Sequence, residues 1–336
     1  MNRRLTGRLS VAVLSAAILA LIGAPVSASD SGNNNGNNNN NNGNNQSQHF
    51  FVIMMENTAY KGLIGNPNAP FINQAAQTYG LATNYYGVSH PSQPNYIAAT
   101  SGALNGVFDD SDITINVPNI VDQLEARDRT WKGYMQSLSL CTTKLDHACG
   151  NQLYERKHNP FVSYADVQND PARMANVVDL SQLGADLASG NVPNYSWISP
   201  DQCNDMHGRG GPTSDTCSFS HVQDLIATGD AFLKSTVRMI MSSDAWTDNS
   251  AIFITWDETD FPFVDVSGCC DAVPGGGHVV TLVITHSRHS HQTSDEAFNH
   301  YSLLATIQRE WRLGCLANTC DKKNVKPMSD LVARED

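Results

Sequence analysis

The sequence predicts an α/β fold in which helices flank a largely parallel central sheet. Several short runs of residues are apolar throughout, as expected of strands that are buried on both faces. Stretches with helical spacing separate these runs, and strands that alternate with helices favour parallel pairing. No internal repeat and no Pro/Gly-rich boundary divides residues 49–336, so we expect one domain there.

In the first half of the chain, the first strand is the clearest element. Residues 49–55, HFFVIMM, are apolar and stop abruptly at Glu56-Asn57, which places two polar side chains at the carboxyl end of the strand. Further along, the polar turn SHPSQPNY precedes a helix, and its two prolines restrict the backbone on both sides of Ser92. The other elements expected in this half are helices over residues 69–79, 96–101 and 121–126, and strands over residues 82–87 and 130–135.

In the second half, three apolar runs predict buried strands. Residues 195–198 end in Ser199-Pro200-Asp201, residues 251–256 end in Asp257-Glu258, and residues 279–285 follow His278. Two stretches of helical spacing, residues 222–241 and 301–311, predict helices.

The N-terminal residues 1–28 have the pattern of a secretory signal peptide. Three arginines precede an apolar run over residues 11–22, and Val26-Ser27-Ala28 is a small-residue cleavage site. An uncleaved anchor is the alternative, but the run is short of the roughly 20 apolar residues that a membrane span needs. Residues 29–48 are mostly Asn and Gly with no apolar side chain to bury, which predicts a flexible linker. We therefore expect a secreted or periplasmic protein.

The chain has eight cysteines, and an even number of cysteines in an exported chain predicts disulfides. The separations along the chain favour Cys141–Cys149, Cys203–Cys217 and Cys315–Cys320. The neighbours Cys269 and Cys270 are left either to form a vicinal bridge or to pair differently.

The charge balance limits the partners. Lys and Arg number 21 against 33 Asp and Glu, a formal net charge of −12, so we expect no nucleic acid partner. No segment after the leader is long and apolar enough to span a bilayer, so we expect at most peripheral membrane contact. The sequence does not define the oligomeric state.

Acidic residues follow three of the predicted strands: Glu56, Asp201, and the pair Asp257-Glu258. Ligands of open α/β sheets bind outside the carboxyl ends of strands, so the fold can gather these carboxylates in one cleft. His90, His207 and His278 lie nearby in the sequence, and carboxylates with imidazoles suit one or two divalent metal ions. Any one of these residues taken alone indicates a structural role; their joint position at strand ends is what favours a functional site.

Ser92 is the candidate nucleophile. It directly precedes a predicted helix, whose N-terminal N–H groups and positive potential favour an anion such as phosphate. A metal ion beside its hydroxyl would lower the hydroxyl pKa and activate it. An ordinary helix-capping serine is the alternative.

These motifs together resemble the bacterial phosphoesterase family, which contains secreted acid phosphatases and phospholipases C within the alkaline phosphatase superfamily. The resemblance covers residues 49–315, with the motifs in family order. It is carried by Met54-Met55-Glu56-Asn57, His90-Pro91-Ser92-x-Pro94-Asn95-Tyr96 with Ser101-Gly102, Asp201…Asp205-x-His207-Gly208, Trp256-Asp257-Glu258, Gly275-Gly276-Gly277-His278 and Asn299-His300-Tyr301-Ser302-Leu303-Leu304.

The resemblance implies a three-layer alkaline-phosphatase-like domain over residues 49–336 that hydrolyses phosphate esters through a phosphoserine. Glu56, Asn57 and Asp257 would hold a divalent metal ion, with Ser92 as nucleophile and Glu258 beside them. Asp201, His207 and His278 would form a second metal or phosphate subsite. His90 and Asn95 would contact the phosphoryl group or hold the turn, and His158, in Lys157-His158-Asn159-Pro160, would line the pocket. Histidines that are protonated at low pH would suit an acid optimum.

Several alternatives stay open at this stage. Asp205 is an alternative to Asp201 as the acidic residue of the second subsite. Thr100 and Ser101 are alternatives to Ser92 as the nucleophile. The site could hold one metal ion or two. In its short length, the chain is more similar to the secreted acid phosphatases, which act on small phosphate esters, than to the longer phospholipases C. A phospholipase C acting on phospholipid headgroups is the alternative, for which the Phe261-Pro262-Phe263 loop would supply an apolar rim.

Other function classes fit less well. Asp110-x-Asp112-x-Thr114 matches a short aspartyl-phosphate motif, but loop-like residues precede it where that motif needs a buried strand. No Gly-x-Ser-x-Gly elbow is present, which argues against an α/β-hydrolase. A non-enzymatic protein that kept the fold is the remaining alternative, and Ser92 together with Asp257 counts against it.

Overall fold

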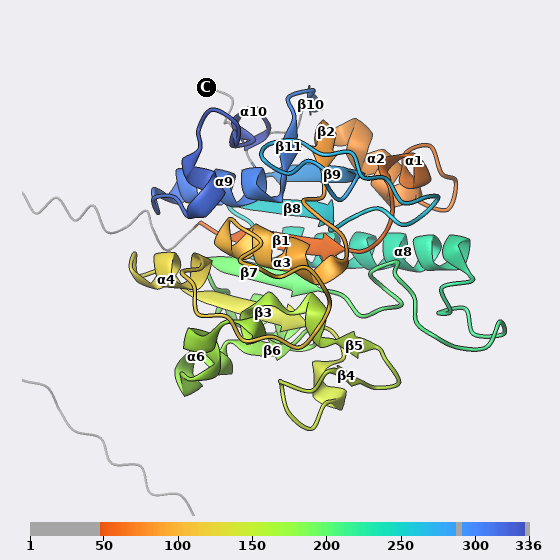
Figure 1. The fold of residues 1–336 in the computed structure, drawn as a ribbon, viewed down its shortest axis with the longest axis horizontal. Coiled ribbons are helices and arrows are strands. Elements are labelled where there is room, and N and C mark those ends of the chain that lie inside the picture. The colour runs from red at the N-terminus through yellow and green to blue at the C-terminus, as the bar shows by residue number, and fades with distance from the viewer. Residues whose placement is uncertain (1–47, 287–290, 333–336) are drawn as a thin grey trace, which may run out of the picture. The chain divides into compact units, whose positions relative to one another are not determined.

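The structure, a computed structural model, describes residues 48–286 and 291–332 (Figure 1). The predicted signal peptide, residues 1–28, and the predicted linker up to residue 47 lie outside these residues. Their assignment therefore stays a prediction. No helix within the described ranges has the length and apolar character needed to cross a membrane.

A nine-stranded mixed sheet forms the centre of the domain, as predicted. Its order is β10-β2-β9-β8-β1-β7-β3-β6, and β11 also pairs with β2. Only β9 runs antiparallel to its neighbours, β8 and β2. The strands are β1 Phe50–Met55, β2 Gly80–Tyr86, β3 Trp131–Met135, β6 Val177–Asp179, β7 Tyr195–Ser199, β8 Ala251–Trp256, β9 His278–Thr285, β10 Gln292–Ser294 and β11 Phe298–Asn299. A separate hairpin joins β4 Ala148–Cys149 to β5 Tyr154–Glu155.

Helices surround this sheet, and contacts pair α3 with α9 and α2 with α8 (Figure 1). The α-helices are α1 Tyr60–Leu63, α2 Pro70–Thr78, α3 Ser92–Ser101, α4 Ile120–Glu125, α5 Ala165–Gln168, α6 Pro171–Ala175, α7 Gln182–Ser189, α8 Val222–Met241, α9 His300–Trp311 and α10 Ser329–Val332. The 3-10 turns are η1 Leu138–Leu140, η2 Arg156–His158, η3 Pro160–Ser163 and η4 Ala317–Cys320.

The predicted elements are all present, with two kinds of difference. Helix α3 begins at Ser92 rather than Tyr96, because Pro94 falls in its first turn, where a missing N–H costs no hydrogen bond. The other difference is that short elements were not predicted. These are the strands β4, β5, β6, β10 and β11, with three residues or fewer, and the helices α1, α5, α6, α7 and α10, with eight residues or fewer. Strands this short are defined by pairing with a neighbour rather than by a long apolar run.

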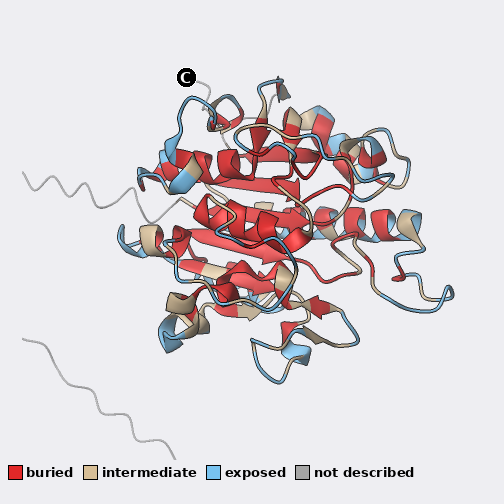
Figure 2. Ribbon diagram, in the orientation of Figure 1, coloured by how far each residue is buried: buried red, intermediate tan, exposed pale blue. Residues whose placement is uncertain are grey.

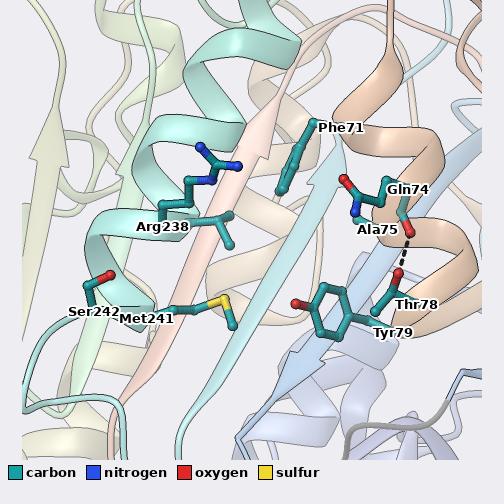
Figure 3. Close-up of a pocket in the computed structure, with 9 residues that line it drawn as sticks. Phe71, Gln74, Ala75, Thr78, Tyr79, Arg238, Met241 and Ser242 are labelled. Atoms are coloured by element: carbon teal, nitrogen blue, oxygen red, sulfur yellow. Dashed lines mark hydrogen bonds between the residues drawn. The ribbon is translucent and has the colours of Figure 1, made fainter.

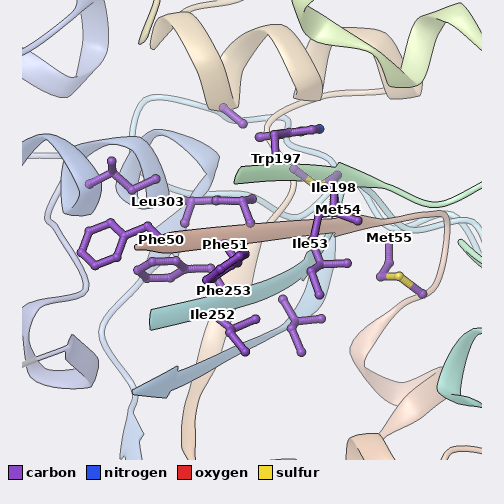
Figure 4. Close-up of a cluster of buried hydrophobic side chains, with 14 of the residues drawn as sticks. Phe50, Phe51, Ile53, Met54, Met55, Trp197, Ile198, Ile252, Phe253 and Leu303 are labelled. Atoms are coloured by element: carbon purple, nitrogen blue, oxygen red, sulfur yellow. The ribbon is translucent and has the colours of Figure 1, made fainter. Parts of the chain in front are cut away.

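The core forms on both faces of the sheet. All six residues of β1 are buried, because β7 and β8 flank it in the sheet and other elements cover its faces (Figure 2). Phe50 stacks on Trp311 of α9 with ring centroids 4.4 Å apart. It also contacts Phe253 of β8 edge-on, with ring centroids 5.6 Å apart (Figure 4). These contacts fix α9 and β8 against the strand that precedes Glu56.

Strand register brings the polar ends of β1, β7 and β8 to one edge. Met55 lies opposite Trp256 in the parallel β1–β8 pair, and Ile53 lies opposite Ile198 in the β1–β7 pair. The residues after these strands are therefore neighbours although about 140 to 200 positions separate them in sequence.

Helix α3 is buried along its entire length, which is unusual for a helix that flanks a sheet. The turn before it is fixed by Asn95. The Oδ1 of this side chain accepts from the N–H groups of Val88 and Ser89 at 2.8 and 3.0 Å, and its Nδ2 donates to the carbonyls of Ser89 and Pro91. The first residue of α3 therefore has a fixed place at the edge of the sheet.

The disulfides confirm the predicted pairing. Cys141–Cys149, Cys203–Cys217 and Cys315–Cys320 are all formed, and Cys269 and Cys270 form the vicinal bridge.

Removing the Cys203–Cys217 disulfide should lower stability more than removing Cys315–Cys320. The two loops span 14 and 5 residues, and loop-closure entropy assigns them about 3 and about 2 kcal/mol of unfolding free energy. Paired Cys→Ser variants measured by urea denaturation test this difference. Equal midpoints for wild type and both variants would show that neither bridge stabilises the folded chain.

Candidate active site

Glu56 lies at the centre of the candidate site and is fully buried. Its Oε1 accepts a hydrogen bond from the Tyr96 hydroxyl at 2.5 Å and lies 3.1 Å from Nε2 of His158. Its Oε2 accepts from the Ser92 hydroxyl at 3.1 Å. Burial, reinforced by Asp257 and Asp205, raises the pKa of Glu56 well above its ordinary value.

Ser92 is the first residue of α3 and lies between two carboxylates. Its Oγ is 3.1 Å from Oε2 of Glu56 and 3.3 Å from Oε1 of Glu258. The other Glu258 oxygen contacts Nδ1 of His90, whose Nε2 is 3.0 Å from the carbonyl of Asp265. Burial lowers the pKa of His90, but Glu258 and the Asp265 carbonyl outweigh it and raise the pKa to about 9. His90 is therefore a cation at neutral pH.

Asp257 and Asn57 face one another across the ends of β8 and β1. Asp257 is fully buried, and its Oδ1 accepts from the backbone N–H of Asn57 at 3.0 Å. Two buried oxygens, Oδ2 of Asp257 and Oδ1 of Asn57, have no hydrogen-bond partner within the described residues. Nε2 of His300 donates to the Asp257 carbonyl at 2.6 Å, so His300 positions this strand end from behind.

A second layer consists of Asp205, His158 and His207. Nδ1 of His158 is 3.5 Å from Oδ2 of Asp205, and the His158 and His207 rings lie 5.8 Å apart. Burial lowers the pKa of His158 well below its ordinary value and that of His207 to about 4, with Lys157 adding to both shifts. The His207 ring is therefore neutral in mildly acidic solution, and of the predicted site histidines only His90 has a raised pKa. These shifts do not support protonated histidines as the cause of an acid optimum.

A cavity of about 330 Å³ opens above Ser92. Its walls include His90, Asp110, Lys157, His207 and Glu258. A different hollow lies between α2 and α8, lined by Phe71, Tyr79, Arg238 and Met241 among others (Figure 3). That hollow contains none of the predicted site residues, so the Ser92 cavity is the candidate active site.

Six predicted site residues do not line this cavity. Glu56, His158 and Asp257 are buried behind its walls, so His158 does not line the pocket as expected. The remaining three, Asp201, His278 and Asn95, use their side chains elsewhere.

Asp201 uses its carboxylate within its own turn, where Oδ2 accepts from Ser137 at 2.9 Å and Oδ1 accepts from the N–H groups of Cys203 and Asn204. Asp205, four residues later, is the acidic residue that reaches the site. The backbone sets this difference, because the Asp205 carbonyl accepts from the Glu56 N–H at 2.9 Å.

The other two are His278 and Asn95. His278 stacks on Tyr60 with ring centroids 4.5 Å apart, and its Nε2 is 3.0 Å from the Thr83 carbonyl. It therefore contributes to packing beside β2 and does not join His207. Asn95 holds the turn before α3, which is one of the two roles expected for it.

The glycines before His278 allow a close backbone approach. A Cβ on Gly276 would lie 2.5 Å from the Ser89 carbonyl and 2.9 Å from the Cα of Gly87. Only glycine fits there, so this motif fixes the loop that leads to Ser92 rather than binding a ligand.

Three residues at the site have roles that the sequence does not predict. The Tyr96 hydroxyl donates to Glu56. The Lys157 Nζ lies 2.9 Å from Oδ2 of Asp110. Asp110, which belongs to the rejected aspartyl-phosphate motif, accepts at its Oδ1 from the Gln93 N–H of α3 at 2.9 Å. The signal available for Lys157 was its place next to a predicted site histidine.

Replacing Glu258 by Gln should change the pH dependence of stability in metal-free protein. Burial raises the pKa of Glu258 to about 7 from 4.5, with His90 opposing and Asp257 reinforcing the shift. The folded state then keeps a proton that the unfolded chain releases, so this contribution is full below pH 4.5 and is lost as the pH rises through 7. Relative to Glu258→Gln, wild type should lose on the order of 2 kcal/mol of unfolding free energy over this interval.

Urea denaturation in chelator at several pH values measures this loss. Glu296→Gln is the control, because Glu296 is exposed and pairs with Lys326 on the surface. A constant stability difference between wild type and Glu258→Gln would contradict the raised pKa.

The phosphoesterase family model matches residues 66–314 of this sequence. The chain belongs to the phosphoesterase family. The matched segment contains Ser92, Lys157 and Asp257, whereas β1 and Glu56 precede it.

Three comparisons describe how far this phosphoesterase family member resembles known proteins. It is 26% identical over 285 residues to a probable acid phosphatase of Kluyveromyces lactis, covering 83% of this chain and 61% of that one. It is 26% identical over 289 residues to a phosphatidylinositol-3-phosphatase of Mycobacterium tuberculosis, covering 84% and 82%. A Vibrio parahaemolyticus structure of the alkaline phosphatase superfamily aligns with a TM-score of 0.51 at 14% identity, over 81% of this chain and 67% of that one.

These comparisons confirm the predicted family and the alkaline-phosphatase-like α/β fold. The chain spans 61% of the length of the yeast relative and 55% of an Aspergillus fumigatus acid phosphatase.

Proposed function

We propose that this chain is a secreted phosphomonoesterase of the acid phosphatase type that works through a phosphoserine on Ser92. One observation carries the proposal. The Ser92 hydroxyl lies at the N-terminus of a buried ten-residue helix, donates toward two buried carboxylates, and opens onto a cavity. A capping serine alone would not need two carboxylates at its hydroxyl.

Two hydrolytic steps follow from this arrangement. In the first, Ser92 Oγ bonds to phosphorus while the bond from phosphorus to the alcohol oxygen breaks, and the serine proton passes to Glu258. The alcohol leaves after taking a proton from the site or from solvent. In the second, water bonds to phosphorus, the bond to Ser92 Oγ breaks, and Ser92 regains a proton.

The donor set fits a divalent metal ion. Within the described residues, Asp257 and Asn57 each have one buried oxygen without a hydrogen-bond partner. Burial raises the pKa of both Glu56 and Asp257, and for Glu56 the charges of Asp257 and Asp205 add to the shift. Oxygen donors of this kind suit hard cations. Glu56, Asn57 and Asp257 would hold the ion, with Ser92 and Glu258 beside it. When bound, it would lower the hydroxyl pKa and stabilise charge on the phosphoryl oxygens.

In the described structure, Glu56, Asp257 and Glu258 do not all place a carboxylate oxygen within 4.8 Å of one another. One group of three His, Cys, Asp or Glu side chains among the described residues does bring its ligand atoms this close: Cys141, Asp146 and Cys149. Its cysteines are joined in a disulfide and cannot bind a metal.

Phosphomonoesters are favoured over phosphodiesters as substrates. The relatives reported above carry phosphatase names, one of them for a phosphorylated phosphatidylinositol, and most of the residues that line the cavity are polar. Two exposed apolar side chains, Phe263 and Val264, could contribute to the apolar rim that a phospholipase would need, and Val264 lines the cavity. Export is supported by the leader pattern of residues 1–28 and by the four disulfides.

The test is hydrolysis by the purified chain of p-nitrophenyl phosphate, bis(p-nitrophenyl) phosphate and phosphatidylcholine, with and without chelator, from about pH 4 to about pH 9. Preference for the monoester with loss of activity in chelator would support the proposal. Preference for the diester or lipid would replace it with a phospholipase C function. No turnover of any of the three would favour a non-enzymatic protein.

A further inference from the structure

Lys157 is the one Lys or Arg among the residues that line the described Ser92 cavity. Its side chain is only 14% exposed, and Asp110 and Asp260 line the same space. Glu258 also lines it, and three further acidic residues, Glu56, Asp205 and Asp257, are buried beneath. An anionic substrate that enters this cavity therefore meets mostly negative charge. The positive charges that face it are Lys157 and His90, and His90 is already paired with Glu258.

The turn that carries Lys157 is firmly held. Lys157 lies in η2, and the guanidinium of Arg156 donates to the carbonyls of Ile113 and Leu145 at 2.8 and 3.2 Å. On the other side, the Ser199 hydroxyl donates to the carbonyl of His158 at 2.6 Å. The two neighbours within this turn face different ways, since His158 points to Glu56 and Lys157 points into the cavity.

Asp110 ties Lys157 to the helix of the nucleophile. One oxygen of Asp110 lies 2.9 Å from the Lys157 ammonium, and the other accepts from the Gln93 N–H at 2.9 Å. The hydrogen bond from the Gln93 N–H to Asp110 stabilises the first turn of α3 and does not involve Lys157. The Lys157–Asp110 ion pair is partly buried, and such pairs add little net stability. Stabilising α3 therefore does not explain why a lysine stands at this position.

We propose that Lys157 binds a non-bridging oxygen of the substrate phosphoryl group and thereby selects phosphomonoesters over phosphodiesters. This inference rests on the proposed function. Asp110 holds the ammonium in place while the cavity is empty of substrate and shares it when a phosphate enters. The selected substrate class is a terminal phosphate on a small alcohol.

The chemistry of the two ester classes explains the selection. Above about pH 6 a phosphomonoester carries two negative charges on three terminal oxygens. A phosphodiester carries one charge on two such oxygens, because a second carbon substituent occupies the third. An ammonium that faces the third oxygen of the monoester forms a charge-assisted hydrogen bond with it. In the diester, the same ammonium faces the carbon substituent and loses this hydrogen bond.

Binding of inorganic phosphate, measured by isothermal titration calorimetry near pH 7.5, tests the contact without turnover. Lys157→Met should weaken phosphate binding by about 10- to 100-fold, as expected for a hydrogen bond to a charged group. Lys157→Arg should restore most of the affinity. Lys132→Met is the matched control. Lys132 lies on β3, outside the cavity, and forms a similar ion pair with Asp186. This variant should bind phosphate as tightly as wild type does.

Asp110→Asn separates a phosphate contact from a structural role. The Asn oxygen can still accept from Gln93, while Lys157 loses its competing carboxylate, so phosphate should bind at least as tightly as in wild type. If Lys157 served only to hold Asp110 and α3, both variants would weaken binding alike, and that result would overturn the inference. Unchanged binding in Lys157→Met would also overturn it.

Turnover separates this inference from the proposed function. Lys157→Met should lower kcat/KM for p-nitrophenyl phosphate at least about 10-fold more than for bis(p-nitrophenyl) phosphate. Lysine-dependent phosphate binding without any hydrolysis would support the contact and overturn the proposed enzyme. A wild-type chain that binds no phosphate would overturn both.

Discussion

Ser92→Ala should lower the turnover of p-nitrophenyl phosphate by at least about 10³-fold while the fold stays intact. The substitution removes the only hydroxyl that the structure places between Glu56 and Glu258, and no neighbouring group within α3 can replace it. Steady-state kinetics with circular dichroism as the folding check measure this loss. In wild type, denaturation in acid during turnover should trap phosphate on the chain, and mass spectrometry should locate it on Ser92.

The rival hydroxyls provide matched controls. Thr100 donates to the Tyr96 carbonyl at 2.8 Å and lies 2.6 Å from the Tyr164 hydroxyl, while Ser101 donates to the Ile97 carbonyl at 2.8 Å. Both lie at the far end of α3 from Ser92, so Ser101→Ala should keep activity within a few-fold of wild type. Near-normal turnover in Ser92→Ala, or a phosphoryl group on Ser101, would rule out Ser92 as the nucleophile.

Asp257→Asn should release most of the bound divalent metal and lower turnover by about 10²-fold or more. Within the part of the chain that the structure describes, Asp257 and Asn57 each have a buried oxygen with no hydrogen-bond partner. Asp257→Asn removes the negative charge of this pair, which weakens the attraction for a cation. Elemental analysis of the dialysed protein gives the metal content, and titration of the stripped protein with a divalent salt gives the affinity.

Asp201→Asn is the control for the metal experiment. The structure uses the Asp201 carboxylate to cap its own turn, and asparagine can still accept from the Cys203 and Asn204 N–H groups. Its metal content should match that of wild type. Loss of metal in Asp201→Asn, or full metal content in Asp257→Asn, would reverse the assignment that the geometry supports.

The sequence alone determined the parts of the fold that depend on burial. The run HFFVIMM predicts β1 because a strand covered on both faces needs apolar residues at every position, and Glu56-Asn57 then has to lie at its carboxyl end. The same reasoning places Asp257-Glu258 after β8. The strand register then brings these two ends together, as predicted.

Only the tertiary structure decided which residues of the loops face the site. Asp201 and Asp205 are both acidic and four residues apart, yet the Ser137 hydroxyl engages the first and the backbone pairing with Glu56 places the second. The family resemblance implies a metal or phosphate subsite for His278, but packing on Tyr60 places this residue beside β2.

The physical reason is that loop side chains are oriented by contacts with residues far away in sequence. Lys157 faces Ser92 because Arg156 anchors its turn to the carbonyl of Ile113, 43 positions earlier, and because Asp110 meets both Lys157 and α3. No local pattern records such contacts. Burial follows from the composition of a short segment, whereas the direction of a side chain in a loop follows from the whole fold.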